Sequence, residues 1–142
     1  MTMDISNDAQ SVLVERTLPH APEKVWRALT ETALIADWLM PSDFRPVVGH
    51  KFSFRTEPAH GWSGVVESEV LAVEPARRLV YRWASDGGLD TVVAWTLEPA
   101  AGGTRLKMEQ SGFRPQDERN RQGAEFGWTR NIEALERVLG AL

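Results

Sequence analysis

The sequence predicts an α+β fold in which a curved antiparallel sheet wraps around a long C-terminal helix. From residue 47 to residue 111, apolar and polar side chains alternate as in strands, and short turn sequences interrupt them. Beyond this region, apolar residues recur at spacings of four and three from Trp128 to Leu142, which is typical of an amphipathic helix. That helix is the one long element available to cover the apolar face of the sheet.

The N-terminal part predicts a strand and two short helices. Residues 11–18 alternate well enough for a strand. Pro22 fits the first turn of a helix, where its missing N–H costs nothing, and Glu23 favours the positive end of the helix dipole. We expect Thr30 to cap a second helix, which ends at Pro41.

Five further strands follow in a meander with short connections. We expect them at residues 51–55, 62–73, 78–83, 90–98 and 104–111. Their alternation gives the sheet one strongly apolar face, made of Phe52, Phe54, Leu79, Tyr81, Trp83, Val93, Trp95, Leu97, Leu106 and Met108.

Length and composition predict one domain. The chain has 142 residues, 42% of them hydrophobic and 25% charged, which is ordinary for a single globular domain. No linker, internal repeat or low-complexity tract divides it. We expect a disordered tail over residues 1–10 and one domain over residues 11–142.

Several functional classes are disfavoured. A net charge of −4 gives no electrostatic footprint for nucleic acid, and no apolar run approaches the roughly 18 residues that cross a bilayer. The chain has no cysteine, and the start of the sequence lacks the features of a signal peptide, so we expect a cytoplasmic protein. His20, His50 and His60 lie in predicted loops without metal-ligand spacing, and we expect neither a metal nor a cofactor.

The many aromatic residues have two interpretations. They could form the core alone, since burying such rings stabilises a fold by about 25 cal/mol per Å². A strongly curved sheet over one helix, however, tends to leave a gap, and a gap lined by rings is a ligand pocket. The predicted ligand-binding residues are Trp38, Phe54, Trp62, Glu67, Trp83, Trp95, Met108, Trp128 and Ile132.

Acid–base chemistry would need a carboxylate that the pocket desolvates. Glu67 and Glu69 on one strand are the leading candidates, because burial can raise a carboxyl pKa towards neutral pH. Strand alternation instead predicts that Arg82 faces solvent and that Glu109 lies on the opposite face of its strand from Met108. Cross-strand ion pairing is therefore a more suitable role for both residues than acid–base catalysis. We assign no catalytic residue.

Several motifs together resemble those of the START-like (SRPBCC) superfamily. Within it, the chain is similar to the family of the C-terminal domain of the activator of heat-shock-protein-90 ATPase. The motifs occupy residues 21–41, 49–54, 62–66, 74–83, 102–113 and 127–128. The resemblance implies a helix-grip (Bet v-like) fold with an internal cavity that the two short helices close at one end. Trp38-Leu39-Met40 replaces the family's usual Trp-Trp-Gly, and Gly49-His50 replaces a paired glycine, so we expect the pocket mouth to differ.

We therefore predict a binding module that holds a small hydrophobic or aromatic molecule between sheet and helix. One alternative is an enzyme similar to the polyketide cyclases of the superfamily, which would use a pocket carboxylate. Another, from the family resemblance alone, is an activator of a chaperone ATPase with a role in the stress response. A homodimer through Trp62 or through the strand edge at residues 11–18 stays open.

Overall fold

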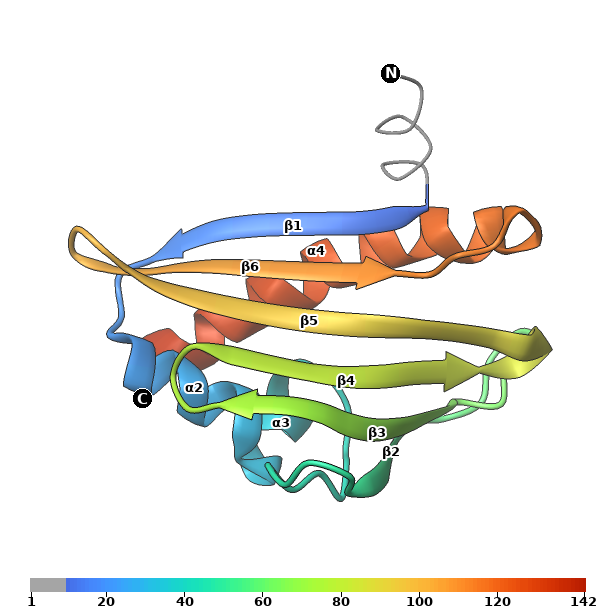
Figure 1. Ribbon diagram of the computed structural model, residues 1–142, viewed down its shortest axis with the longest axis horizontal. Helices are drawn as coiled ribbons and strands as arrows, with labels where there is room; N and C mark the ends of the chain where they lie inside the picture. Colours follow the sequence, from blue (N-terminus) through green and yellow to red (C-terminus); the bar gives the residue numbers. More distant parts are fainter. Residues whose placement is uncertain (1–9) are drawn as a thin grey trace.

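The structure, a computed structural model, describes residues 10–142. Within them, six strands form one antiparallel sheet in the order β1-β6-β5-β4-β3-β2. The helices α2 (Pro22–Thr30), α3 (Thr32–Trp38) and α4 (Glu118–Ala141) lie behind this sheet in Figure 1, and α4 crosses behind β6 and β5. The predicted α+β helix-grip architecture is confirmed. Apart from Gln10, the predicted tail over residues 1–10 lies outside the described residues.

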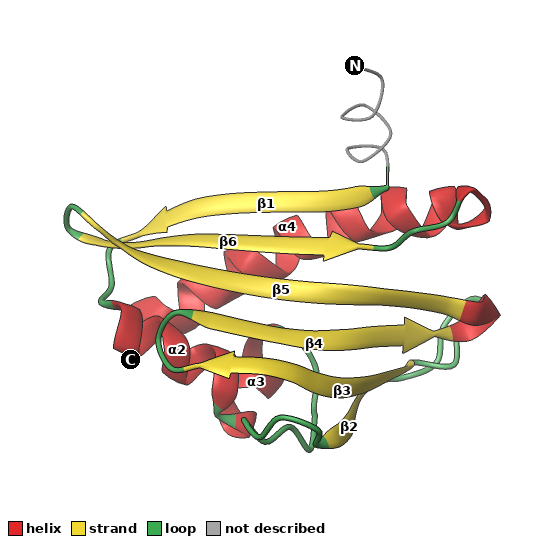
Figure 2. Cartoon of the chain, in the orientation of Figure 1, coloured by secondary structure: helices red, strands yellow, loops and turns green. Residues whose placement is uncertain are grey.

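The elements follow the predicted order, as the colours of Figure 1 show, and Figure 2 distinguishes the helices from the strands. The strands are β1 (Ser11–Leu18), β2 (Lys51–Arg55), β3 (Val65–Glu74), β4 (Arg78–Ser85), β5 (Leu89–Ala100) and β6 (Gly103–Ser111). The helices are α2 (Pro22–Thr30), α3 (Thr32–Trp38) and α4 (Glu118–Ala141), with single 3-10 turns at η1 (Asp86–Gly88) and η2 (Pro115–Asp117). The predictions for the first two strands are confirmed to the residue.

The prediction that Thr30 caps the second short helix is wrong. Thr30 is the last residue of α2, and its hydroxyl donates to the Trp26 carbonyl at 2.7 Å. Glu31 instead has extended backbone angles, and its carbonyl accepts hydrogen bonds from Leu34 and Ile35. Thr30 fails as the cap because it still belongs to α2, and its side chain is directed back along that helix towards Trp26.

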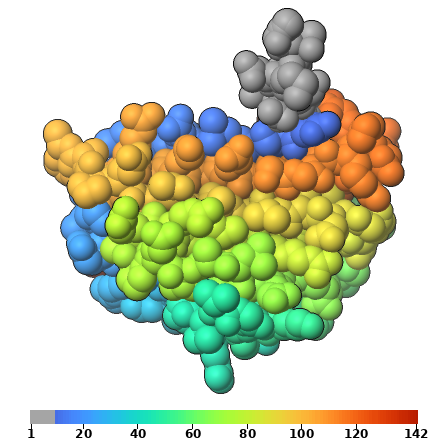
Figure 3. Space-filling view, in the orientation of Figure 1, coloured from blue at the N-terminus to red at the C-terminus, as the bar shows by residue number. Residues whose placement is uncertain are grey.

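The core lies between the inner face of the sheet and α4. The helix buries Trp128, Ile132, Leu135 and Leu139, whose spacings of four and three place them on one side. The outer face of the sheet, seen in the space-filling view, carries the alternate residues of each strand (Figure 3). Within residues 10–142, no helix combines the length and the apolar character needed to cross a bilayer.

Candidate functional site

A cleft of about 950 Å³ lies between one end of the sheet and the N-terminal half of α4. This is the end where β4 turns through η1 into β5, at the right in Figure 1. The loop between β2 and β3 forms a further side, and residues 39–40 after α3 reach the cleft as well. Its apolar lining includes Trp62, Val66, Trp83, Leu89, Phe113 and Trp128.

Small residues of α4 leave the cleft open on the helix side. Gly123, Ala124 and Gly127 all line it, and Gly127 follows the other two by four and three residues, which places them on one side of the helix. A Cβ atom added at Gly123 or Gly127 would meet no atom within 4 Å. The space beside this part of α4 is therefore not filled by protein.

Three tryptophans form the aromatic wall. The ring centroids of Trp83 and Trp128 lie 5.1 Å apart with an interplanar angle of 57°. The Trp62 indole N–H donates to the Ser85 hydroxyl at 2.8 Å, and that hydroxyl donates to the Val65 carbonyl at 2.9 Å. Each ring is thus held by packing or by a hydrogen bond, which gives a bound molecule a fixed apolar surface.

Gln110 lies in the same wall, and the sequence analysis missed it. Its side chain is buried and accepts a hydrogen bond from the Trp128 indole N–H at 2.7 Å. Its amide N–H donates to the Thr91 hydroxyl at 2.9 Å. The signal was present in the alternation of β6, where Gln110 follows Leu106 and Met108 on the inward face. A polar residue at an inward position needs a hydrogen-bonding partner, which can include a ligand.

Asp86 is the one carboxylate among the described residues that line the cleft. It lies exposed at the mouth and accepts hydrogen bonds from the backbone N–H and the hydroxyl of Ser63, at 2.7 and 2.8 Å. These bonds, the backbone one foremost, hold the pKa of Asp86 below its ordinary value. Asp86 is therefore ionised at neutral pH and suits a structural role at the mouth better than proton transfer.

An ion pair between the buried Asp117 and the exposed Arg114 holds the start of α4 beside this mouth. Asp117 accepts hydrogen bonds from the backbone and guanidinium N–H groups of Arg114, each at 2.8 Å. Arg114 also donates to the Gly87 carbonyl at 3.2 Å, which links η1 to the helix. Hydrogen bonds from the Arg114 side chain are the main cause that lowers the pKa of Asp117 to about 2.

Replacing Asp117 with Asn should lower the free energy of unfolding by about 1–2 kcal/mol at pH 7. The pKa of Asp117 is about 2 in the folded protein and about 3.9 in an unfolded chain, so its ionised form stabilises the fold above about pH 4. That contribution disappears as the pH falls from about 4 to 2. Urea unfolding at several pH values measures this contribution. If the free energies of unfolding of wild type and Asp117→Asn differed by the same amount from pH 7 down to pH 2, the prediction would be wrong.

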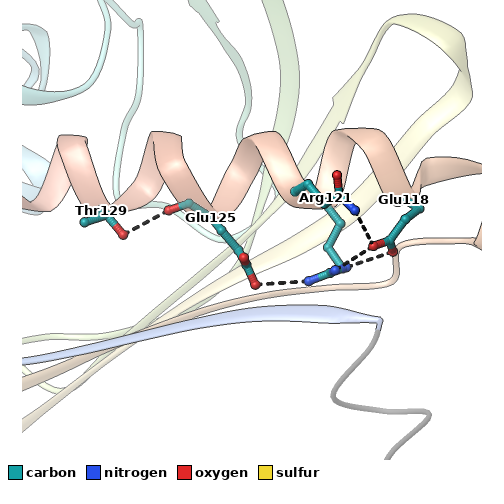
Figure 4. Close-up of polar contacts among 5 residues, drawn as sticks. Glu118, Arg121, Glu125 and Thr129 are labelled. Atoms are coloured by element: carbon teal, nitrogen blue, oxygen red, sulfur yellow. Dashed lines mark hydrogen bonds and ion pairs between the residues drawn. The ribbon is translucent and has the colours of Figure 1, made fainter.

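A second group of ion pairs supports the first turns of α4 (Figure 4). Arg121 bonds to Glu118 at 2.6 Å and to Glu125 at 3.1 Å, and Gln122 also donates to Glu118 at 3.0 Å. The bond from Arg121 is the main cause that lowers the pKa of Glu118 to about 2. None of these residues lines the cleft, so the helix is stabilised without using the side chains that face it.

The structure brings three of the predicted site residues together. Trp62, Trp83 and Trp128 line the cleft. Five others are at most 4% exposed and lie in the core without lining it: Trp38, Phe54, Trp95, Met108 and Ile132. Some of these pack directly behind the wall, since Phe54 lies 5.1 Å from Trp83 and Trp95 lies 5.7 Å from Trp128, between ring centroids.

The charged candidates lie elsewhere. Glu67 is exposed between the buried residues Val66 and Ser68, so it points to the outer face of the sheet. Arg82 is also exposed and pairs with Asp90 at 2.8 Å, which confirms that it faces solvent. Within residues 10–142, no three His, Cys, Asp or Glu side chains converge on a point that could hold a metal ion.

Comparisons with known proteins agree with this fold. Residues 19–140 match the family model described as Activator of Hsp90 ATPase homolog 1-like protein. The crystal structure of protein MLL2253 from Mesorhizobium loti is 47% identical, with a TM-score of 0.86 over 93% of this chain and 98% of that one. No curated protein matches the chain.

Two further solved structures are more distant. DynU16, from the dynemicin biosynthetic locus, is 27% identical with a TM-score of 0.77, over 92% of this chain and 47% of its own. Protein CV1439 from Chromobacterium violaceum shares the fold at 22% identity, with a TM-score of 0.76 over 92% of this chain and 97% of that one. With the family model matched over most of its length, the chain belongs to the family of Activator of Hsp90 ATPase homolog 1-like proteins.

Proposed function

We propose that the cleft binds a small apolar or aromatic molecule, with Trp62, Trp83 and Trp128 as its wall. The observation that carries this proposal is a space of about 950 Å³ beside these three rings. Sites for small molecules typically measure roughly 300–1,000 Å³ and are mostly apolar with a few polar groups. Open space over Gly123 and Gly127 supports it, because larger residues at these positions would occupy that space.

A titration with hydrophobic and polycyclic molecules tests this proposal. The wall residues are themselves fluorophores, so a bound aromatic molecule should quench tryptophan emission. A ligand that binds only the folded state should also raise the melting temperature as its concentration rises. If neither emission nor melting temperature responds to any member of the panel, the tryptophans serve only the core and the proposal fails.

The cyclase-like alternative has less support. It requires a carboxylate or another acid–base group that the cleft desolvates. Glu67 is exposed on the outer face, and Asp86 is held in its ionised form at the mouth. His60 also lines the cleft but is exposed in the loop between β2 and β3.

The remaining functional expectations stay predictions. Family membership makes activation of a chaperone ATPase a hypothesis, which an ATPase assay with the chaperone tests directly. The cytoplasmic location, the role in the stress response and the homodimer likewise await measurement. None of them is needed for the proposal that the cleft binds a small molecule.

A further inference from the structure

We infer that Gln110 recognises a neutral oxygen-bearing group, a hydroxyl or a carbonyl, at the buried end of the molecule in the cleft. This inference rests on the proposed binding function and adds to it the polar feature that the ligand carries. Gln110 is 2% exposed, although it lines the cleft. Among the described residues that line the cleft, it is the one polar side chain that is buried.

The neighbours of Gln110 fix which way its carboxamide points. The Trp128 indole N–H is only a donor, so the Gln110 oxygen must face it, at 2.7 Å. The amide nitrogen therefore faces Thr91, whose hydroxyl donates its own proton to the Trp83 carbonyl at 2.8 Å. The hydroxyl can then accept the amide proton. The chain of hydrogen bonds from Trp128 to Trp83 runs in one direction, and the amide cannot turn over without breaking it.

This arrangement leaves Gln110 with unused hydrogen-bonding capacity. A carboxamide has two donor protons and two acceptor lone pairs, and the bonds to Trp128 and Thr91 use one of each. One N–H and one lone pair are left over on a side chain that lines the cleft together with the apolar residues Trp83 and Trp128. A hydroxyl can use both, by accepting the N–H and donating to the oxygen, and a carbonyl can accept the N–H.

The charge of the surroundings favours a neutral group over a carboxylate. A buried anion is costly unless a cation pairs with it. The positively charged side chain that lines the cleft within the described residues is Arg119, and it is exposed. The structure thus assigns the buried end of the ligand to a phenol-like or ketone-like oxygen on an apolar, preferably aromatic, body.

Two probes of similar size test this inference: 2-naphthol, which has a hydroxyl, and 2-methylnaphthalene, which does not. Their dissociation constants should be measured for wild type and for Gln110→Met, at a temperature where both are folded. The preference for 2-naphthol should fall by about threefold to tenfold in Gln110→Met, as expected for one lost neutral hydrogen bond. Gln122→Met, the same change at an exposed position of α4, should leave the preference unchanged.

A measurement on wild type alone covers the case in which Gln110→Met does not fold. The side-chain amide NMR signals of Gln110 should shift with 2-naphthol and shift clearly less with 2-methylnaphthalene. Equal shifts with both probes, or an unchanged preference in a folded Gln110→Met, overturn the inference while binding itself persists. Absence of binding by either probe would instead count against the proposed function.

Discussion

Replacing Gly127 with Phe should weaken the binding of 2-naphthol at least tenfold without destabilising the protein. Side chains on a helix lean towards its N-terminus, so a ring at position 127 would lie over Gly123 and Ala124, inside the cleft. No atom within 4 Å of the added Cβ opposes the change. Phe also has a higher helix propensity than Gly, which should raise the free energy of unfolding by up to about 0.5 kcal/mol.

Gly140→Phe is the matched control for this prediction. Gly140 lies in the same helix with open space around its added Cβ, but near the C-terminus of α4 and outside the cleft. It should change stability by a similar small amount and leave binding intact. Calorimetric titration and urea unfolding of both variants check this, and unchanged affinity in a folded Gly127→Phe would place the ligand elsewhere.

Gly103→Ala should destabilise the fold by about 3 kcal/mol, the upper end for overpacking a tightly packed site. Gly103 begins β6, and a Cβ atom there would overlap the Leu18 carbonyl oxygen and lie 2.9 Å from the His20 nitrogen. Both contacts are with backbone, which cannot rotate away as a side chain would. The next residue, Thr104, donates its hydroxyl to the His20 carbonyl at 2.7 Å, so the end of β1 is held against this turn.

Gly102→Ala provides the comparison for the neighbouring position. Gly102 has a φ of +78° but open space around its added Cβ. Alanine there should cost about 1 kcal/mol, from the left-handed backbone alone. Chemical unfolding of both variants tests the difference, and equal losses would mean that the contact with Leu18 relaxes without cost.

The fold was predictable because its signals are local and mutually consistent. Alternation located the strands at residues 11–18 and 51–55, and the spacing from Trp128 to Leu139 located the face that α4 buries. The same spacing was wrong for Leu142, which follows the end of α4 and is exposed. The Thr30 error came from a choice between neighbouring residues. Threonine is a preferred cap residue and glutamate is not, yet the extended backbone of Glu31 places the cap there.

The site was less predictable, because alternation tells which face a residue occupies but not how far along the sheet a cleft opens. Trp83 and Trp95 share the inward face, yet Trp83 lines the cleft and Trp95 is fully buried. That difference depends on where α4 crosses the strands and on the missing side chains at Gly123 and Gly127. The prediction that Glu67 binds the ligand failed for another reason. Val66 and Ser68 occupy the inward positions of β3, so Glu67 between them points outward.

The measurement that tests the proposed cleft most directly is a titration of ¹⁵N-labelled protein with 2-naphthol, followed at the tryptophan indole N–H signals. Trp62, Trp83 and Trp128 line the cleft, whereas Trp26 in α2 and Trp38 in α3 do not. We expect the signals of the first three to shift with a common dissociation constant while those of Trp26 and Trp38 stay in place. Shifts confined to Trp26 and Trp38, or none at saturating probe, would contradict binding in the cleft.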